Sequence, residues 1–279
     1  MTDGAAEIGF ARRGGVTRLA HLYQTDPLRV LFPLPEAGDP IQAAIVTTSG
    51  GLVAGDRIDL AVRVEPGASA HVTASAAEKI YRSPLSGNGG ATTAIRQSLT
   101  AGCGAALEFL PPETILFDGA WLRRETVVEL GPGAAFLGGD IVVFGRRARG
   151  ERFTHGLLRE VWEVRRKGVL VWGDALHLDG DIAAIVDDPA CFDGAAGFAT
   201  LILVPAGRDP QKFLDDARAV QTAAPQGVRA GVTIVAGLLL ARFLAGDAAL
   251  LRRAYADLAC HWRAEALGLP PRLPRIWHV

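Results

Sequence analysis

Cysteine, methionine and tyrosine are scarce in this 279-residue chain, which contains three, one and three of them. Cys103, Cys191 and Cys260 lie far apart and form no Cys-x-x-Cys pair, so they predict no disulfide framework and favour a reducing compartment. The first fifteen residues lack the apolar stretch of a signal peptide. We therefore expect a cytoplasmic protein.

Strong charge and long apolar runs are missing as well. The formal net charge is −1, which provides no bulk attraction to nucleic acid or to an anionic membrane. The longest uncharged apolar run, about 230–241, is too short to span a bilayer and is typical of a buried helix. We expect neither nucleic acid nor a membrane among the partners.

The motifs of several enzyme and cofactor classes are also missing. The Gly-rich turn at 49–57 lacks the Gly-Lys-Ser/Thr of a phosphate loop, and no Gly-x-Gly-x-x-Gly, Gly-x-Ser-x-Gly or His-Glu-x-x-His occurs. No two of the six histidines share a helical turn, and none lies near a cysteine at zinc spacing. The chain is therefore predicted to be no enzyme, with no bound cofactor and no tight metal site.

The residues that are present predict a mainly β fold. Apolar residues alternate with polar ones from Ile58 to Glu65, the period of a half-buried strand, and Pro66-Gly67 then turns the chain. Similar patterns predict further strands at 16–23, 28–32, 41–46, 70–74, 105–110, 125–130, 135–144, 157–165, 169–172, 182–186 and 198–204.

Glycine turns recur at a spacing close to that of a structural repeat. Gly67, Gly102, Gly133 and Gly168 each follow the end of a predicted strand, and successive members are 35, 31 and 35 residues apart. A unit of this length holds two or three strands, which suggests stacked β-coils around a shared interior, a β-helix or solenoid-like body. Ordinary hairpins are the alternative.

The pattern changes near residue 205, where helical spacing begins. Helices are predicted at 211–222, 232–245 and 248–267, the first capped by Asp209 and the last stopped by Gly268. The tail 270–277 must be extended, and its Trp277 docks either on its own core or on a partner. We expect one domain, with a β body at about 1–205 and a helical region and tail at about 206–279.

Carboxylates near glycine turns or within apolar stretches are the candidate polar sites: Asp56, Glu78, Asp118, Asp140 and Glu151. Asp140 is the sharpest case, because 136–144 is otherwise wholly apolar. A carboxylate there must be paired, solvated or ligating. The structural alternative is an ion pair with Arg146, Arg147 or Arg149.

Two basic segments are candidate protein contacts. Arg146 and Arg149 belong to the densest basic run, at 146–152, and Lys79, Tyr81 and Arg82 form a strand end with a tyrosine between cations. Arginine and tyrosine are enriched at protein interfaces. A solvated turn and a simple surface strand are the alternatives.

Four segments, in order, resemble the urease accessory protein D family over nearly the whole chain. The first runs from Thr48-Ser-Gly-Gly-Leu52 through Gly55-Asp-Arg57 to Lys79-Ile-Tyr-Arg-Ser83. The others are Leu110-Pro-Pro-Glu-Thr-Ile-Leu-Phe-Asp-Gly119, Gly145-Arg146 with Gly150-Glu-Arg-Phe153, and Pro274-Arg-Ile-Trp277. Thr47 and Ala54 depart from the family pattern, which usually has Asn at the first position and often has Gly at the second.

The resemblance implies a β-helix-like scaffold that binds apo-urease and recruits the F-type accessory protein and the G-type GTPase for nickel insertion. It also implies transient Ni²⁺ and an interior metal conduit with weak oxygen ligands, for which Asp56, Asp140 and Glu151 are the candidates. The candidate partner contacts are Lys79, Tyr81, Arg82, Arg146, Arg149, Arg275 and Trp277.

Two alternatives come from other functional classes. A β-solenoid carbohydrate-active hydrolase or lyase would use an acid pair such as Asp56 and Asp140, and would require a carbohydrate groove. A purely structural interaction module would bind urease with no dependence on metal.

Overall fold

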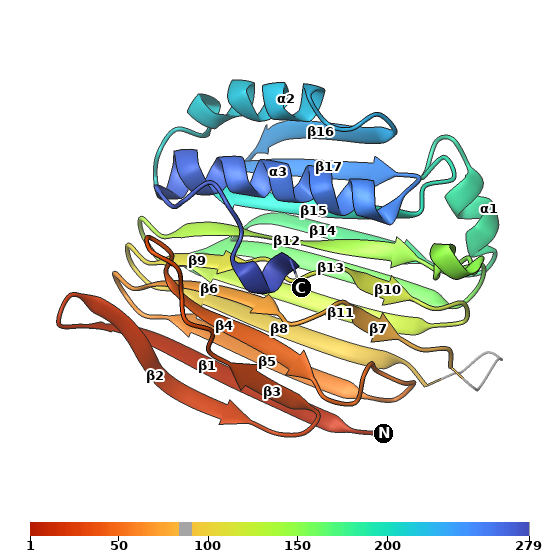
Figure 1. The fold of residues 1–279 in the computed structure, drawn as a ribbon, viewed down its shortest axis with the longest axis horizontal. Coiled ribbons are helices and arrows are strands. Elements are labelled where there is room, and N and C mark those ends of the chain that lie inside the picture. Colours follow the sequence, from red (N-terminus) through yellow and green to blue (C-terminus); the bar gives the residue numbers. More distant parts are fainter. Residues whose placement is uncertain (84–90, 279) are drawn as a thin grey trace.

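The computed structural model describes residues 1–83 and 91–278. Two β-sheets face each other, and two C-terminal helices cover the outer side of one sheet (Figure 1). The strands of both sheets run along the long axis of the molecule, so the turns between strands lie at its two ends. The mainly β prediction is confirmed.

The first sheet has seven strands in the order β14-β13-β11-β8-β5-β1-β2. The five inner strands, β1, β5, β8, β11 and β13, are all parallel to one another. The two edge strands, β2 and β14, are antiparallel to the strands beside them. The bounds are Asp3–Arg13 for β1, Val16–Gln24 for β2, Arg57–Val64 for β5, Thr93–Ala101 for β8, Trp121–Leu130 for β11, Leu157–Arg166 for β13 and Val169–Leu178 for β14.

The second sheet has ten strands, eight of them in the order β16-β17-β15-β12-β9-β6-β4-β3, with β10 beside β12 and β7 beside β10. The bounds are Leu28–Leu31 for β3, Ile41–Thr47 for β4, Ser69–Ala74 for β6, Glu78–Ile80 for β7, Ala106–Phe109 for β9, Thr114–Leu116 for β10, Ala135–Phe144 for β12, Gly197–Val204 for β15, Val228–Val235 for β16 and Leu238–Ala245 for β17.

From β4 to β13 the chain alternates between the two sheets, apart from the short strands β7 and β10. The predicted glycine turns end successive strands of the seven-stranded sheet in register, since Val64 pairs with Ala101, Ala101 with Leu130, and Leu130 with Arg166. One circuit through both sheets therefore accounts for the repeat of 31 to 35 residues. The antiparallel edge strands do not follow this alternation between the sheets. The description as a solenoid-like body is therefore an interpretation that applies to the central circuits alone.

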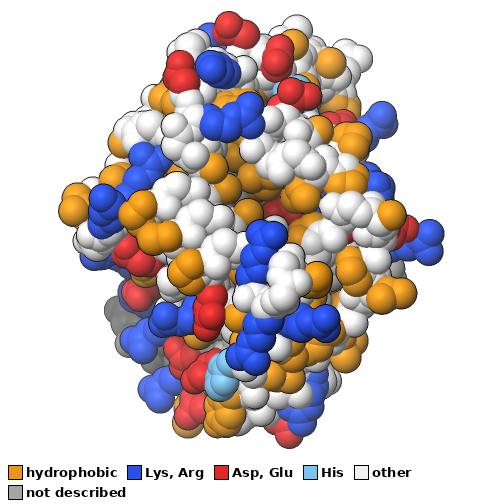
Figure 2. Space-filling view, turned by 90° about the vertical axis from the view of Figure 1, so that its left-hand side faces the viewer, with side chains coloured by type: hydrophobic (Ala, Val, Ile, Leu, Met, Phe, Trp, Pro, Cys, Tyr) orange, Lys and Arg blue, Asp and Glu red, His pale blue; other side chains and the backbone are white. Residues whose placement is uncertain are grey.

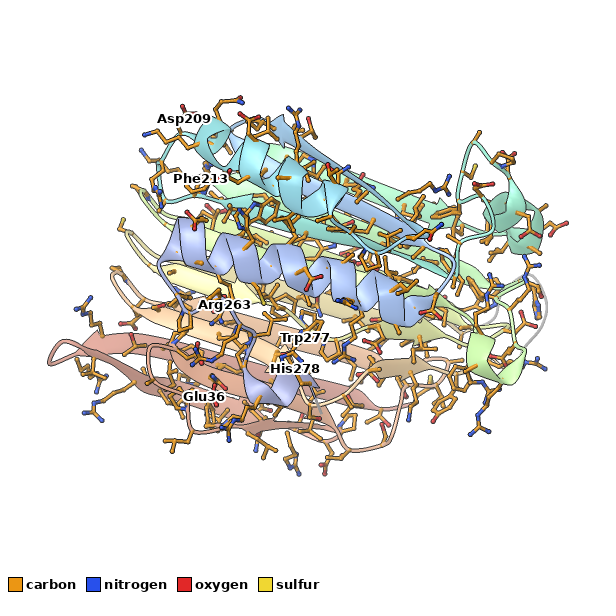
Figure 3. All side chains as sticks on the ribbon, turned by 45° about the horizontal axis from the view of Figure 1, so that its top comes forward. Glu36, Asp209, Phe213, Arg263, Trp277 and His278 are labelled. Carbon is orange, nitrogen blue, oxygen red and sulfur yellow. The ribbon has the colours of Figure 1, made fainter. Side chains whose placement is uncertain are left out.

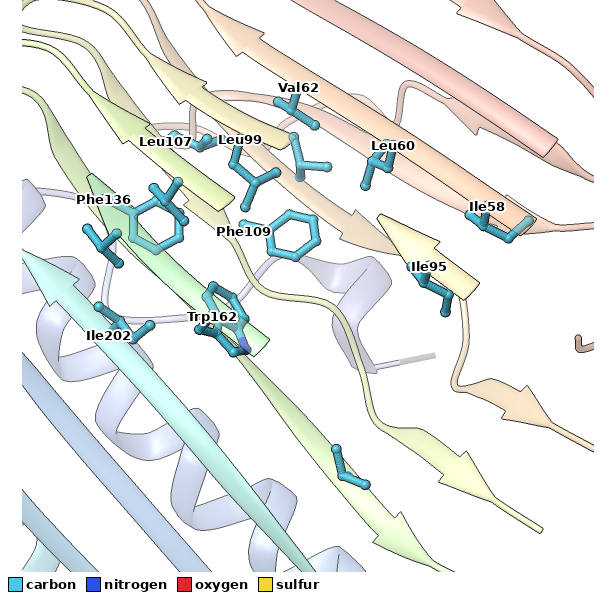
Figure 4. Packing of buried hydrophobic residues seen from close by; sticks show 14 of the residues in the cluster. Ile58, Leu60, Val62, Ile95, Leu99, Leu107, Phe109, Phe136, Trp162 and Ile202 are labelled. Atoms are coloured by element: carbon cyan, nitrogen blue, oxygen red, sulfur yellow. The ribbon is translucent and has the colours of Figure 1, made fainter. Parts of the chain in front are cut away.

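The main hydrophobic core lies between the sheets. Ile58, Leu60 and Val62 point inward from β5, as the alternation predicted, and meet Phe109 and Phe136 from the opposite sheet (Figure 4). A second hydrophobic cluster joins the outer face of the ten-stranded sheet to the C-terminal helices. Burial of the facing apolar side chains drives the two sheets together, and strands such as β12 and β15 are buried on both faces.

The two C-terminal helices follow their predicted signals. α3 (Ala248–Leu267) begins after Asp247, whose carboxylate accepts hydrogen bonds from the backbone N–H groups of Ala249 and Leu250, and ends at Gly268 with φ of 66°. α2 (Leu214–Thr222) follows a 3₁₀ turn at Pro210–Phe213 that Asp209 caps. The predictions of a helix at 248–267 and of helical structure at 211–222 are confirmed.

Two predicted elements are wrong, the end of the tail predicted as extended is a 3₁₀ helix (Arg275–His278), and not every strand was predicted. The segment 232–245 is no helix but most of the hairpin β16–β17, which turns at Ala236 and Gly237 with positive φ and extends the ten-stranded sheet beyond residue 205. The segment 182–186 is no strand but helix α1 (Ile182–Asp187), capped by Asp181. The longest strand that was not predicted, β1, lies between β2 and β5; the short strand β10 was not predicted either.

Within residues 1–83 and 91–278, none of the helices combines the length and apolar character that a bilayer crossing requires.

Candidate functional site

Three of the four segments that carry the family resemblance meet at one end of the body, on the right in Figure 1. Backbone hydrogen bonds join them in series: the N–H of Leu52 donates to the carbonyl of Lys79 at 2.8 Å, that of Phe117 to Ile80 at 3.0 Å, and that of Gly119 to His155 at 3.0 Å. We call the surface formed by 47–56, 78–83, 110–120 and 144–155 the motif surface.

Most candidate partner contacts share the motif surface. Tyr81 packs edge-on against Phe117 with ring centroids 4.8 Å apart, and its hydroxyl donates to the carbonyl of Gly50 at 3.1 Å. The Arg146 guanidinium lies 4.2 Å from the centre of the same Phe117 ring. Lys79, Arg82 and Arg149 are exposed. This surface combines cations with aromatic rings, a composition common at protein interfaces.

Asp118 holds the 145–155 loop onto the motif surface. One carboxylate oxygen accepts hydrogen bonds from the backbone N–H and the hydroxyl of Thr154 at 2.7 and 2.8 Å, and it lies 3.2 Å from His155. Burial alone would raise the pKa of Asp118, but the bonds from Thr154 bring it below its ordinary value. The carboxylate therefore stabilises the loop.

Behind the motif surface lies a cavity of about 160 Å³ between the two sheets. Glu78 lines it and accepts a hydrogen bond of 2.5 Å from the hydroxyl of Thr47, where the resembling family usually has Asn. Burial raises the pKa of Glu78, which the Thr47 bond only partly opposes. Although Thr47 differs from the usual Asn of the family, its hydroxyl still provides a hydrogen-bond donor in the cavity wall.

Arg124 forms part of the cavity wall, points inward from β11 and is 5% exposed. Its guanidinium donates to both oxygens of Glu160 at 2.7 and 2.9 Å, to Asp140 at 3.1 Å and to the hydroxyl of Thr114 at 2.7 Å. Burial raises the pKa of Glu160 to about 8, against the lowering effect of Arg124 and with a further contribution from Asp140. Burial therefore favours the protonated form of Glu160 at neutral pH.

The predicted partners of Asp140 were wrong. Its carboxylate binds Arg124 and the indole N–H of Trp162 at 3.2 Å, not the arginines that follow it in the chain. Those arginines lie in the turn after β12, whereas Arg124 faces Asp140 across the interior. Asp140 Oδ1 is buried and has no hydrogen-bond partner among the described residues. A polar residue at an inward position of the alternating strand 121–130 was the signal that could have identified Arg124.

The other two conduit candidates are held by neighbouring groups. The Asp56 carboxylate accepts hydrogen bonds from the backbone N–H groups of Thr2 and Val53 at 2.8 and 3.0 Å. Glu151 binds Arg146 at 3.1 Å and accepts from the N–H of Asp118. Because Asp56 and Asp140 are both engaged by other groups, the structure does not support the acid pair of the hydrolase alternative.

The C-terminal tail docks on its own core, which decides between the two options for Trp277. The indole is 2% exposed, stacks on Tyr255 with centroids 6.4 Å apart, and donates from Nε1 to the carbonyl of Leu110 at 3.0 Å (Figure 3). In this conformation Trp277 cannot contact a partner directly. The side chain of Arg275 is 88% exposed and pairs with Glu36 at 2.5 Å.

A second buried ion cluster, which the sequence did not reveal, anchors α3 and the tail. Arg263, which Figure 3 labels on α3, donates to Glu108 at 2.6 Å and to Asp39 at 3.1 Å. Glu108 also lies 3.2 Å from His71. Burial would raise the pKa of Glu108, but His71 and Arg263 hold it below its ordinary value. Glu108 lies on the face of the short strand β9 (Ala106–Phe109) that α3 covers, and an acidic residue within this apolar strand was the available signal.

Comparison with known proteins gives matches over nearly the whole chain. A family model described as UreD urease accessory protein matches residues 2–278. A protein from Magnetococcus marinus named urease accessory protein UreD is 43% identical, with 99% of this chain and 94% of that protein covered. A protein of the same name from a Methylobacterium species is 42% identical, with 95% and 90% covered.

Proposed function

The chain belongs to the UreD family of urease accessory proteins, which gives it a role in urease maturation, and from this premise we propose that it acts as a scaffold without catalysis of its own. The scaffold binds apo-urease in the cytoplasm and recruits the F-type accessory protein and, through it, the G-type GTPase. Nickel then reaches the urease active site as cargo.

The convergence of three motif segments on one surface carries this proposal. Segments drawn from residues 47–155 are joined there in series by backbone hydrogen bonds, and they present Tyr81, Arg82 and Arg146 together. A binding surface explains why cations and aromatic rings remain partly exposed at this end of the body.

Activation of urease tests the proposal directly. Urease subunits and the other accessory proteins are expressed in nickel-containing medium with and without this chain, and urease activity and bound nickel are measured. We expect both to be lost without the chain and restored when it is returned. Full activity and full nickel content in its absence would refute the maturation role.

We propose further that nickel passes through the interior near the cavity behind the motif surface. Two features support this path: Glu78 lines the cavity, and Asp140 Oδ1 lacks a hydrogen-bond partner among the described residues, next to Arg124 in the wall. Carboxylate oxygens would hold Ni²⁺ more weakly than a His or Cys site, which suits transfer. Asp56 and Glu151 stay candidates, although both are engaged by neighbouring groups.

Asp140→Asn, alone or with Asp56→Asn, is expected to lower the nickel content of urease several-fold while leaving urease binding unchanged. The amide keeps the shape of the carboxylate but removes the charge that attracts a cation. Nickel per urease and co-purified complex are measured side by side. Asp179→Asn, at a 68% exposed side chain, is the matched control. Normal nickel loading in the double variant would exclude these residues from the path.

Arg275 is the proposed contact of the tail with the F-type protein. Deletion of 270–279 would also remove Trp277 from the core, so its effect on binding could not be separated from unfolding. Arg275→Glu is expected instead to weaken F binding about tenfold, through charge reversal at an exposed position. Arg253→Glu on α3, with a side chain 72% exposed, is the control. Equal affinity of the Arg275 variant and the wild type would refute this contact.

A further inference from the structure

The seven-stranded sheet ends in two edge strands, β14 and β2, each of which pairs with one described strand only. β2 forms one of these edges, and its outer side pairs with no described strand. It has nine residues and no proline, so little in its sequence blocks further pairing. In the ten-stranded sheet, by contrast, the edge strand β3 has only four residues and the edge strand β16 is packed by α2. β2 is therefore suited to accept another strand.

Exposed hydrophobic side chains gather on and beside this edge. Of the eleven large hydrophobic residues exposed in the described chain, seven fall within 16–34: Val16, Leu19, Leu22, Tyr23, Leu31, Phe32 and Leu34. Leu34 is 93% exposed, and Pro33 and Pro35 on either side restrict its backbone. We call residues 12–34 the β2–β3 surface. An apolar group of this size on a sheet edge indicates a protein contact.

The β2–β3 surface also carries unneutralised positive charge. Arg12, Arg13 and Arg18 are exposed and form no ion pair with a described acidic residue, whereas Arg29 is paired with Asp26 at 2.6 Å. Figure 2 shows several basic side chains beside hydrophobic ones, with some acidic side chains among them, over the lower half of the face where β1 turns into β2. An occupant with acidic groups is favoured over a second copy of this chain, which would bring the same cations.

We propose that the β2–β3 surface binds an extended, acidic segment of a protein partner, which joins the seven-stranded sheet as a strand beside β2. This inference rests on the role in urease maturation and assigns that role a second contact surface, distinct from the motif surface. Backbone pairing along β2 provides affinity, Arg13 and Arg18 attract carboxylates, and Leu34 enters an apolar pocket of the partner. A membrane surface would leave the backbone edge of β2 unpaired.

The test uses the full chain with two purified probes in turn, apo-urease and the F-type accessory protein. The variants are Arg13→Glu with Arg18→Glu, and separately Leu34→Asp. A matched control, Lys167→Glu with Leu170→Asp, makes similar changes at the opposite edge of the same sheet, where Leu170 is 51% exposed. Affinity is measured at two salt concentrations, and hydrogen exchange of the β2 amides is followed in each complex.

We expect both variants to bind one of the two probes at least about tenfold more weakly, a change that corresponds to about 1.4 kcal/mol, while the control binds as the wild type does. Added salt should weaken wild-type binding more than binding of the double arginine variant. The β2 amides should exchange more slowly in the wild-type complex. Unchanged affinity and unchanged β2 exchange, with urease activation intact, would overturn this surface and leave the maturation role standing.

Three other results would also overturn the proposal. If the chain alone forms a dimer and the double arginine variant does not, the occupant of the β2–β3 surface is a second copy of the chain. Binding to vesicles of phosphatidylserine and phosphatidylcholine, with no protection of β2 by either protein, would identify a membrane. A wild-type chain that binds neither probe and fails to activate urease would remove the maturation role together with this inference.

Discussion

Arg263→Ala is expected to lower the free energy of unfolding by about 3–5 kcal/mol, because it leaves buried carboxylates without their cation. Arg263 has no exposed surface and donates to both Glu108 and Asp39. It therefore ties α3 to the ten-stranded sheet and to the loop that holds the tail. Chemical denaturation of wild type and variant at pH 7 measures the difference.

The pH dependence identifies the mechanism of this loss. Arg263 helps to hold the pKa of Glu108 below its ordinary value, so the stability it contributes is present above the unfolded pKa of about 4.3 and is lost as pH falls through the folded pKa. The difference between wild type and variant should shrink in acid. Arg253→Ala on the exposed side of α3 should cost less than about 0.5 kcal/mol. A similar small cost for Arg263→Ala would show that the buried cluster is not stabilising.

Arg124→Met is expected to have an effect of similar size, about 3–5 kcal/mol near pH 8, because Asp140 and Glu160 would lose their shared cation. The pKa of Glu160 is already about 8, and it would rise further without Arg124. Stability of the variant should therefore fall more steeply than that of the wild type as pH rises from 6 to 8, with a limiting slope of about 1.4 kcal/mol per pH unit for each additional bound proton.

Arg123→Met is the matched control for this second prediction. Arg123 is the preceding residue on β11 but points to the exposed outer face. Its replacement should change stability by less than about 0.5 kcal/mol at either pH. Denaturation curves of the wild type and both variants at pH 6 and pH 8 provide the comparison. Equal curves for Arg124→Met and the wild type at pH 8 would contradict the proposed balance of charges in the cavity wall.

Where secondary structure depends on local signals, the sequence alone predicted it well. The alternation at 58–64 places β5, and β12 was predicted with the observed bounds of 135–144. The limits of α3 follow from Asp247 and Gly268, because a cap and a left-handed stop act on the adjacent turn. The motif segments identified the family from their order and residue types.

Pairings over long range were decided by the tertiary structure. The apolar run 232–245 fits a buried helix and a buried strand equally well. It forms a hairpin because β16 pairs with β17, and β17 joins the sheet by pairing with β15. Likewise, Asp140 is paired with Arg124, sixteen residues earlier in the chain, because their strands face each other across the core. The motif surface and the Arg263 cluster arise in the same way. The alternation of apolar and polar residues predicts each strand separately. These contacts depend instead on which strands the fold places next to each other.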